Sequence, residues 1–289
     1  MVIYFLIFFI IFVAACALII YHDVHCFVVR SYDIETDKIV GDYSFAFLSD
    51  LHGYSFGKDN SKLLDEIYKI SPDAVLCAGD MLTGHKIGGE IQYQTGLKLL
   101  SALATRYPVY MSNGNHEHKI KDYKRCFGDV YDVYKQKLID SGIIFLENDS
   151  FSIDSKNIRI TGLDLELDYF QKVIKKEMNY EHVKELVGDS SPDEFQILIA
   201  HNPQYFDNYA KWGANLTVSG HVHGGIVRIP FLGGVISPSI ALFPKYDGGK
   251  FEIDGKYMVL SRGLGTHSIH VRMFNPCELD IIRIHGKEN

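Results

Sequence analysis

The chain contains 289 residues, enough to bury a substantial core in one large domain or two ordinary ones. Its formal net charge of −7 argues against a general nucleic-acid-binding protein, which needs a basic face to displace counterions from phosphates. A phosphorylated substrate is not excluded, because bound metal ions can supply local positive charge. The five cysteines show no CxxC spacing, so the sequence predicts neither a thiolate zinc site nor a disulfide framework.

The first twenty residues, "MVIYFLIFFIIFVAACALII", carry no charged side chain. At 1.5 Å per residue such a helix is about 30 Å long, which matches the hydrocarbon thickness of a membrane. A cleaved signal peptide would have a basic start and a small-residue site closing the apolar run, and neither is seen. "VAAC" resembles a lipoprotein cleavage box, but hydrophobic residues continue past Cys16. We therefore predict a single-pass transmembrane anchor over residues 1–21 and one domain over residues 22–289.

The alternative for this N-terminal segment is a buried core helix, which would show an amphipathic pattern that the sequence lacks. The charge bias that orients membrane helices gives almost no information here, because no Lys or Arg precedes the segment and the first one after it is Arg30. The sequence thus predicts a cell-membrane location without assigning the domain to one side.

Strands and helices alternate through the first half of the domain. Apolar stretches predict strands at residues 27–35 and 43–50, and the spacing of "SKLLDEIYKI" predicts a helix over residues 61–70. Strands dominate later in the chain, which indicates an α/β domain with more than one sheet. Further strands are expected at residues 73–80, 108–116, 142–148, 157–164, 195–203, 215–225, 257–265 and 278–286, and further helices at residues 96–107 and 130–142.

Two segments between predicted strands have two interpretations each. Residues 164–191 are charged, and we expect a helical excursion with a solvated face; a lid over a site is the alternative. Residues 226–246 are unusually apolar for a connecting segment. We expect strands and loops that pack on the core, and the alternative is a hydrophobic rim that admits a lipid-like substrate.

Side chains that can bind metal follow five of the predicted strands. Taken singly, each motif is weak, because Asp-x-His arises by chance, "GD" is common in turns, and a lone His is usually structural. A turn, however, has no reason to end five of these strands with Asp, Asn and His. Ligands collect beyond the carboxyl ends of strands in α/β sheets, so we expect these groups to converge. They are Asp50, His52, Asp80, Asn115, His116, His201, His221 and His223.

The mixture of imidazole, carboxylate and amide oxygen suits borderline divalent ions such as Mn²⁺, Fe²⁺ or Zn²⁺. Without His116 the set has seven members, too many for one ion and suited to two ions that share a carboxylate. Two ions about 3.5–4 Å apart are a recurrent device for phosphoester hydrolysis. His116 is not needed as a ligand, and its imidazole could protonate a leaving oxygen.

The blocks "SDLHG", "CAGDMLTG", "SNGNHEH", "IAHNP" and "SGHVHGG" occur in this order between residues 49 and 225. This ordered set resembles the signature of the calcineurin-like metallophosphoesterases. The later stretches "VRIPFLGGVISPS", "FPKYDGG" and "SRGLGTHSIHVRMFNPCELDII" resemble the membrane-associated branch that includes UDP-2,3-diacylglucosamine pyrophosphatase-like enzymes. The resemblance implies a four-layer α/β/β/α sandwich of two mixed sheets, with metals at one edge and a metal-bridging hydroxide that attacks phosphorus in line.

The resemblance also assigns roles to individual residues. The glycines around "GHVHGG" are expected to give room for backbone and substrate phosphate to approach closely. The first metal would be held by Asp50, His52 and His223, with Asp80 bridging both metals, Asn115, His201 and His221 holding the second, and His116 acting as the acid or phosphate-orienting group.

Two positions depart from the family pattern. Many members have an Asp that orients the catalytic His at the position of Thr83, and a hydroxyl cannot act as a carboxylate partner. Ile226 stands where Gln is expected. Among other residues near the motifs, His118 and His267 are candidates for a role in the site, and Arg262 is expected to contact either a phosphate or a structural ion-pair partner.

The sequence therefore predicts a membrane-anchored hydrolase with two divalent ions that cleaves phosphodiester or pyrophosphate bonds, including those of a lipid-linked substrate. Mn²⁺ is the expected metal, with Fe²⁺ or Zn²⁺ as alternatives. A phosphomonoesterase or phosphoprotein phosphatase would use the same metal core. A non-catalytic membrane scaffold with a degenerate metal site is a third hypothesis.

Overall fold

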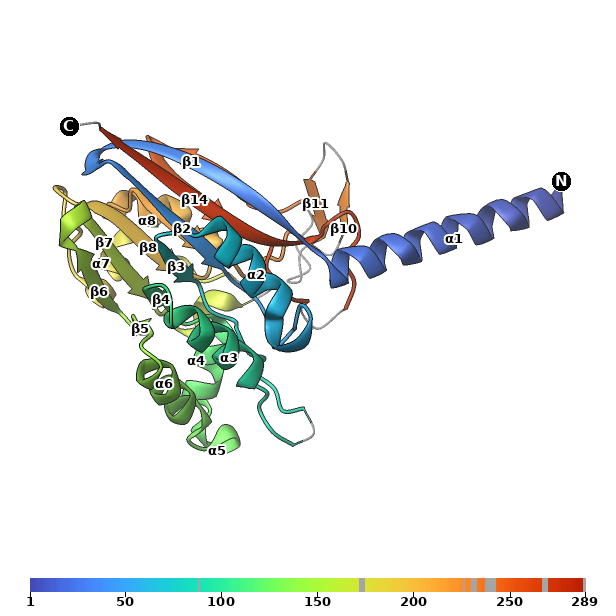
Figure 1. Cartoon of the computed structure of the whole chain (residues 1–289), viewed down its shortest axis with the longest axis horizontal. Coiled ribbons are helices and arrows are strands. Elements are labelled where there is room, and N and C mark those ends of the chain that lie inside the picture. The colour runs from blue at the N-terminus through green and yellow to red at the C-terminus, as the bar shows by residue number, and fades with distance from the viewer. Residues whose placement is uncertain are drawn as a thin grey trace.

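The computed structural model describes residues 1–87, 89–171, 175–225, 227–229, 233–236, 243–266 and 270–287. Two mixed six-stranded sheets form the centre of the domain (Figure 1). The strand order is β1-β14-β2-β3-β4-β5 in the first sheet and β12-β13-β9-β8-β7-β6 in the second. This arrangement confirms the predicted α/β class with more than one sheet.

In the first sheet, β2, β3, β4 and β5 run parallel, so that their carboxyl ends lie at one edge. The long strand β14 runs antiparallel to β2 and parallel to β1. The bounds are β1 Phe27–Val40, β2 Asp42–Leu48, β3 Ala74–Cys77, β4 Val109–Met111, β5 Ile144–Phe145 and β14 Cys277–Lys287.

In the second sheet, β13, β9, β8 and β7 run parallel, and the edge strands β12 and β6 pair antiparallel with their neighbours. A separate two-stranded sheet pairs β10 with β11. The bounds are β6 Asp149–Ile153, β7 Ile158–Leu163, β8 Phe195–Ala200, β9 Leu216–Ser219, β10 Val227–Ile229, β11 Gly233–Ile236, β12 Gly249–Ile253 and β13 Lys256–Leu260.

The side chains of β2 show how the layers arise. Phe45 and Phe47 lie in the apolar cluster between the two sheets, whereas Ala46 and Leu48 face the cluster beneath the helices. Alternate residues of a strand point to opposite faces, so a strand covered on both sides is apolar throughout. The predicted four-layer sandwich is thereby confirmed.

Helices cover the outer face of each sheet (Figure 1). Their inward apolar residues complete the cores; Leu63 and Ile67 of α2 do so on the first sheet, and Tyr209 and Trp212 of α8 on the second. The first face carries α2 Ser61–Ile70, α3 Gln94–Ala104, α4 Asn115–Asp122 and α6 Val130–Asp140, with the short α5 Lys124–Phe127 between the last two; the second carries α7 Tyr180–Val187 and α8 Phe206–Trp212.

Several elements differ from the sequence prediction. The strand predicted over residues 108–116 ends at Met111, and α4 begins at Asn115 within the same stretch. Residues 164–191 contain a short 3-10 turn, Leu167–Phe170, and α7, so the helical expectation holds in part; residues 172–174 lie outside the described residues. Strands β6 and β12 were not among the predicted elements.

The N-terminal helix α1, Val2–His25, projects away from the domain (Figure 1). It is long enough and apolar enough to cross a membrane, and a signal sequence would meet the same criteria of length and composition. Only Asp23 and Val24, in its last turn, are buried against the domain. A single residue, Cys26, separates the helix from β1, so no flexible linker joins them.

Candidate metal centre

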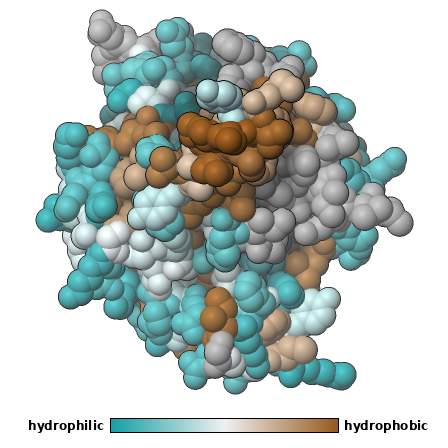
Figure 2. Space-filling view, turned by 90° about the vertical axis from the view of Figure 1, so that its right-hand side faces the viewer, coloured by the Kyte–Doolittle hydropathy of each residue, from teal (hydrophilic) through white to brown (hydrophobic). Residues whose placement is uncertain are grey.

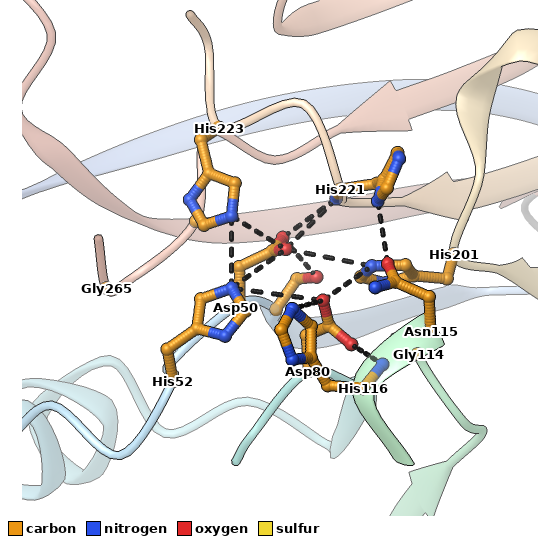
Figure 3. Close-up of polar contacts among 12 residues, drawn as sticks. Asp50, His52, Asp80, Gly114, Asn115, His116, His201, His221, His223 and Gly265 are labelled. Carbon is orange, nitrogen blue, oxygen red and sulfur yellow. Dashed lines mark hydrogen bonds and ion pairs between the residues drawn. The ribbon is translucent and has the colours of Figure 1, made fainter. Parts of the chain in front are cut away.

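The polar residues predicted at the strand ends lie together at one edge of the sandwich (Figure 3). Residues from the first sheet come from the segments after β2, β3 and β4, and those from the second come from the segments after β8 and β9. Parallel strands present their carboxyl ends at the same edge, which is why residues distant in sequence converge. The converging residues are Asp50, His52, Asp80, Asn115, His116, His201, His221 and His223.

One group of possible ligands consists of Asp50, His52 and His223. The two imidazole Nε2 atoms are 3.1 Å apart. His223 Nε2 is 3.3 Å from Asp50 Oδ1, and His52 Nε2 is 3.8 Å from the same oxygen. Three ligand atoms that face a common point at these distances fit the coordination of one ion.

A second group consists of Asp80, His201 and His221. His201 Nε2 lies 3.2 Å from Asp80 Oδ2, and His221 Nδ1 lies 2.8 Å from Asn115 Oδ1. Asp80 Oδ2 is also 3.8 Å from His52 Nε2, which belongs to the first group. Asp80 thus lies between the two groups, as a residue shared by two ions would.

The hydrogen bonds of two imidazoles orient their Nε2 atoms in a way that suits metal binding. Nδ1 of His201 donates to the Ala78 carbonyl at 2.6 Å, and Nδ1 of His52 lies 3.3 Å from the Leu82 carbonyl. A neutral ring whose Nδ1 donates carries its lone pair on Nε2, and in both residues Nε2 faces the carboxylates. His201 Nε2 is buried beside Asp80 Oδ2.

The electrostatics of the centre also favour bound cations. Burial, reinforced by the nearby Asp80, raises the pKa of Asp50 to about 6 against the opposing effect of His201. Burial lowers the pKa of His201, but the two carboxylates outweigh it and raise that pKa to about 9. Asp50 Oδ1 and Asp80 Oδ2 lie 3.7 Å and 3.2 Å from His201 Nε2, and two buried carboxylates that face one point are stabilised by positive charge there. The residues therefore fit divalent metal ions.

Backbone strain is concentrated at this centre. Among the described residues, thirteen non-glycine residues have positive φ, and five of them belong to the predicted ligand set. Strained backbone of this kind persists where the surrounding structure imposes it, often at functional sites. The five are Asp50, His52, Asp80, His221 and His223.

Two glycines allow the strand-end segments to approach each other. A Cβ atom on Gly114 would lie 2.2 Å from Asp80 Oδ1, and one on Gly220 would lie 2.2 Å from Asp50 Oδ2. At Gly224 the nearest atoms belong to Asn275 and Arg262. The glycines around "GHVHGG" therefore let chain segments approach closely, and the approach of a substrate phosphate stays a prediction.

His116 is oriented by a backbone group. The Gly84 N–H donates to His116 Nδ1 at 2.5 Å, so a neutral ring carries its proton on Nε2, which lies 3.8 Å from Asp80 Oδ2. Thr83 does not take this part; its hydroxyl is buried without a hydrogen-bond partner in the described structure. Burial lowers the pKa of His116, which favours the neutral ring. His116 is thus built to donate a hydrogen bond from Nε2.

Glu117 is a site residue that the sequence analysis missed. Its buried carboxylate accepts hydrogen bonds from the backbone N–H groups of Asp80, Met81 and Gly114. It therefore joins the segment after β3 to the start of α4 and fixes Asp80 relative to Asn115. The available signal was an acidic residue directly after "GNH", inside a stretch that otherwise resembles a loop.

The other candidates have structural partners. His118 Nδ1 lies 2.7 Å from Asp164 Oδ1, and Arg262 Nε is 3.6 Å from Glu278 Oε2. Both contacts are ion pairs with acidic residues outside the predicted ligand set. His267 and Ile226 lie outside the described residues.

A cavity of about 260 Å³ adjoins the centre. It extends from the candidate ligand His52 and from His116 to Tyr54. The Tyr54 ring stands edge-on to that of His25 at the end of α1, with 6.2 Å between the ring centroids. The remaining lining of the cavity is Gly53, Thr83, His85, Ile87, Thr266 and His270.

The fold and the clustered carboxylates and imidazoles define a metal-dependent hydrolase acting on phosphoric esters. A family model described as calcineurin-like phosphoesterase matches residues 43–225, and the chain belongs to that family. YpbG, an uncharacterized protein of Bacillus subtilis (strain 168), is 26% identical over 250 residues, which cover 84% of this chain and 81% of YpbG. An uncharacterized metallophosphoesterase of Aquifex aeolicus (strain VF5) is 26% identical over 271 residues, or 90% and 93% of the two chains. The phosphodiesterase YaeI of Escherichia coli (strain K12) is 24% identical over 231 residues, or 78% and 76%.

Proposed function

We propose that the protein is a membrane-anchored, binuclear metal-dependent phosphohydrolase that cleaves phosphodiester or pyrophosphate bonds. The observation that carries the proposal is the arrangement of two groups of ligand atoms around the shared carboxylate Asp80. The similarity to a protein named as a phosphodiesterase supports this bond type.

The proposed ligand sets follow the geometry. Mn²⁺ is the proposed metal, with Fe²⁺ or Zn²⁺ as alternatives, because the set mixes imidazole, carboxylate and amide oxygen. When bound, two such ions orient a phosphate, lower the pKa of water and offset developing charge. One ion would be held by Asp50, His52 and His223 and the other by Asn115, His201 and His221, with Asp80 shared.

His116 would act on the substrate as a hydrogen-bond donor. Its Nε2–H points into the space beside Asp80, where a phosphoryl oxygen or a leaving oxygen would lie. The Gly84 amide occupies Nδ1 and holds the ring in this orientation. We infer that this backbone contact takes the part of the carboxylate that the family resemblance led us to expect at the position of Thr83.

A substrate carried by a lipid fits the position of the cavity. Tyr54 and the half-exposed Ile87 line it, and Tyr54 also contacts the foot of α1. If α1 spans the bilayer, the cavity opens close to the membrane surface, where the phosphate of a lipid headgroup could reach the metal centre.

Hydrolysis of bis-p-nitrophenyl phosphate by the purified full chain with Mn²⁺ tests the reaction. Asp80→Ala should abolish turnover, whereas the matched change Asp149→Ala, on the exposed edge strand β6, should leave it intact. Undiminished activity of Asp80→Ala would refute the site. A panel that includes p-nitrophenyl phosphate separates diesterase from monoesterase activity, and faster monoester turnover would establish the alternative function.

The lipid-linked substrate has its own test. Turnover of a diester presented in vesicles is compared with that of a soluble diester, and equal rates would argue against lipid specificity. Ile87→Ser should lower the ratio of lipid-linked to soluble turnover. Ile139→Ser removes another exposed apolar side chain, from α6, and should leave the ratio unchanged.

A further inference from the structure

Exposed apolar side chains lie in segments beside the foot of α1. Figure 2 looks onto the side of the molecule from which α1 projects, and the apolar surface there includes the helix itself, seen end-on. Three large apolar side chains of the neighbouring segments are exposed: Phe243 at 60%, Phe274 at 47% and Ile229 at 42%. We call these three residues the apolar foot.

Contacts within the chain place the apolar foot beside α1. Asn275, next to Phe274, donates its backbone N–H to Asp23 in the last turn of α1, at 2.8 Å. Met273, on the other side of Phe274, pairs with Val227 at the start of β10. Ile229 ends β10, and the Phe243 N–H donates to the carbonyl of Val235 in β11. The hairpin and the segment around Phe274 therefore extend one surface from the helix.

The two phenylalanines hold a strained backbone. Phe243 has φ 47° and Phe274 has φ 54°, in a region that bulky side chains rarely adopt. The other positive-φ residues of the described chain, glycine apart, are the candidate ligands and small polar residues of types that tolerate this region better. Packing in the core does not offset the cost of this strained backbone, because the two rings are exposed to water. The strain points to a contact outside the chain.

The position of α1 identifies that contact. Residues 2–21 precede the buried last turn, and at 1.5 Å per residue they form about 30 Å of helix, the thickness of the hydrocarbon core. The domain then begins at once, because only Cys26 separates α1 from β1. If α1 spans a bilayer, a face beside the end of the helix is held against the headgroup region of that bilayer.

We propose that the apolar foot inserts into the interfacial region of the bilayer that α1 spans and fixes the tilt of the catalytic domain on the membrane. The proposal rests on the membrane anchor of the proposed function. Aromatic and aliphatic side chains at this depth bury their apolar surface among acyl chains while the backbone remains near the headgroups. A rigid joint at Asp23 and a second contact at the apolar foot together determine the orientation of the domain.

Tryptophan quenching by brominated lipids tests the proposal with the full chain in phosphatidylcholine vesicles. Phe243→Trp, Phe274→Trp and Ile229→Trp report on the apolar foot. The one native tryptophan, Trp212, is buried with its indole N–H bonded to the Gly188 carbonyl, so its emission forms a constant background. Ile229 has an unstrained strand backbone, so its variant folds even if tryptophan disturbs the two phenylalanine positions.

Two further variants make the outcomes separable. Phe8→Trp lies within α1 and reports insertion of the anchor itself. Phe151→Trp replaces another exposed ring, 40% accessible, on β6, at the far side of the domain from α1 (Figure 1). We expect loss of emission at position 8 and at the apolar foot, and no loss at position 151.

Quenching at position 8 without quenching at the apolar foot would overturn the docking surface and leave the anchor standing. If a second copy of this chain covered the apolar foot instead, quenching would likewise be absent at the foot, and the protein would be a dimer in solution. An unquenched position 8 would overturn both anchor and docking surface. Hydrolysis of bis-p-nitrophenyl phosphate, measured on the same samples, reports the proposed enzyme activity separately.

Discussion

Replacing Gly220 by Ala would place a methyl group in space already filled by two side chains of the candidate metal centre. The new Cβ would lie 2.0 Å from Ser49 Oγ and 2.2 Å from Asp50 Oδ2. Non-bonded heavy atoms prefer separations of about 3.5 Å or more, so these groups must move apart by more than about 1 Å. Gly220 does not have positive φ in this structure, so the effect of the methyl group is collision and not backbone strain.

The expected loss follows from that displacement. A misplacement of about 1 Å in a catalytic arrangement costs roughly 10²-fold in rate. Asp50 is a candidate ligand, so kcat/KM for bis-p-nitrophenyl phosphate should fall by about that factor, and bound Mn²⁺ should fall with it. Overpacking a core position lowers the free energy of unfolding by about 1–3 kcal/mol, so the variant should still fold.

Gly142→Ala is the control for this prediction. Gly142 has φ +88°, so Ala strains the backbone there, but its Cβ meets no atom within 4 Å. This variant should lose stability and keep full activity. A Gly220→Ala enzyme with metal content and kcat/KM within about threefold of wild type would refute the assignment of Asp50 to a position-sensitive metal ligand.

Three further predictions concern buried carboxyl groups. Glu117→Gln turns an N–H donor toward backbone N–H groups and should lower kcat by about tenfold with less change in KM, whereas Glu66→Gln, at a partly exposed position of α2, should not; an unchanged kcat would contradict the positioning role. Burial, with repulsion from Glu278, raises the pKa of Asp280 well above its ordinary value, so the folded state holds a proton that the unfolded state releases. The free energy of unfolding of Asp280→Asn should therefore increase relative to that of wild type as pH rises above about 4. The difference should grow by about 1.4 kcal/mol per pH unit until the folded-state pKa of Asp280 is reached. A difference in the free energy of urea unfolding that does not change with pH would contradict this. Chelation should abolish hydrolysis and lower Tm, with both restored by Mn²⁺, because the buried carboxylates of the centre would lose their counter-charge; a Tm insensitive to chelation and to added Mn²⁺ would contradict the cation requirement.

Local patterns predicted some elements well. Helix α2 has the predicted bounds, because its apolar residues fall on one face of a helical period. The start of α4 was missed, because "NGNH" has the composition of a loop and the helix begins there through contacts of Glu117. That contact involves Asp80 and Gly114, which the sequence does not place near each other.

The convergence of the polar side chains was predictable, but the hydrogen bonds that orient them were not. The order of the five blocks indicated which side chains would meet. The partner of His116 proved to be the amide of Gly84, and a backbone group has no residue type by which a sequence could reveal it. The same limit applies to the apolar foot, because exposure of Phe243 and Phe274 depends on how two distant segments lie beside α1.

The left-handed backbone of five candidate ligands has a consequence for how the chain would change under mutation. Each such conformation costs of order 1–3 kcal/mol, and the sum is comparable to the whole stability of a typical domain. Glycine or asparagine at these positions would relieve much of it. His52, His221 and His223 are therefore held at a cost in stability that glycine or asparagine would not incur. Metal ions bound by these side chains would offset that cost, because a ligand that binds only the folded state stabilises it.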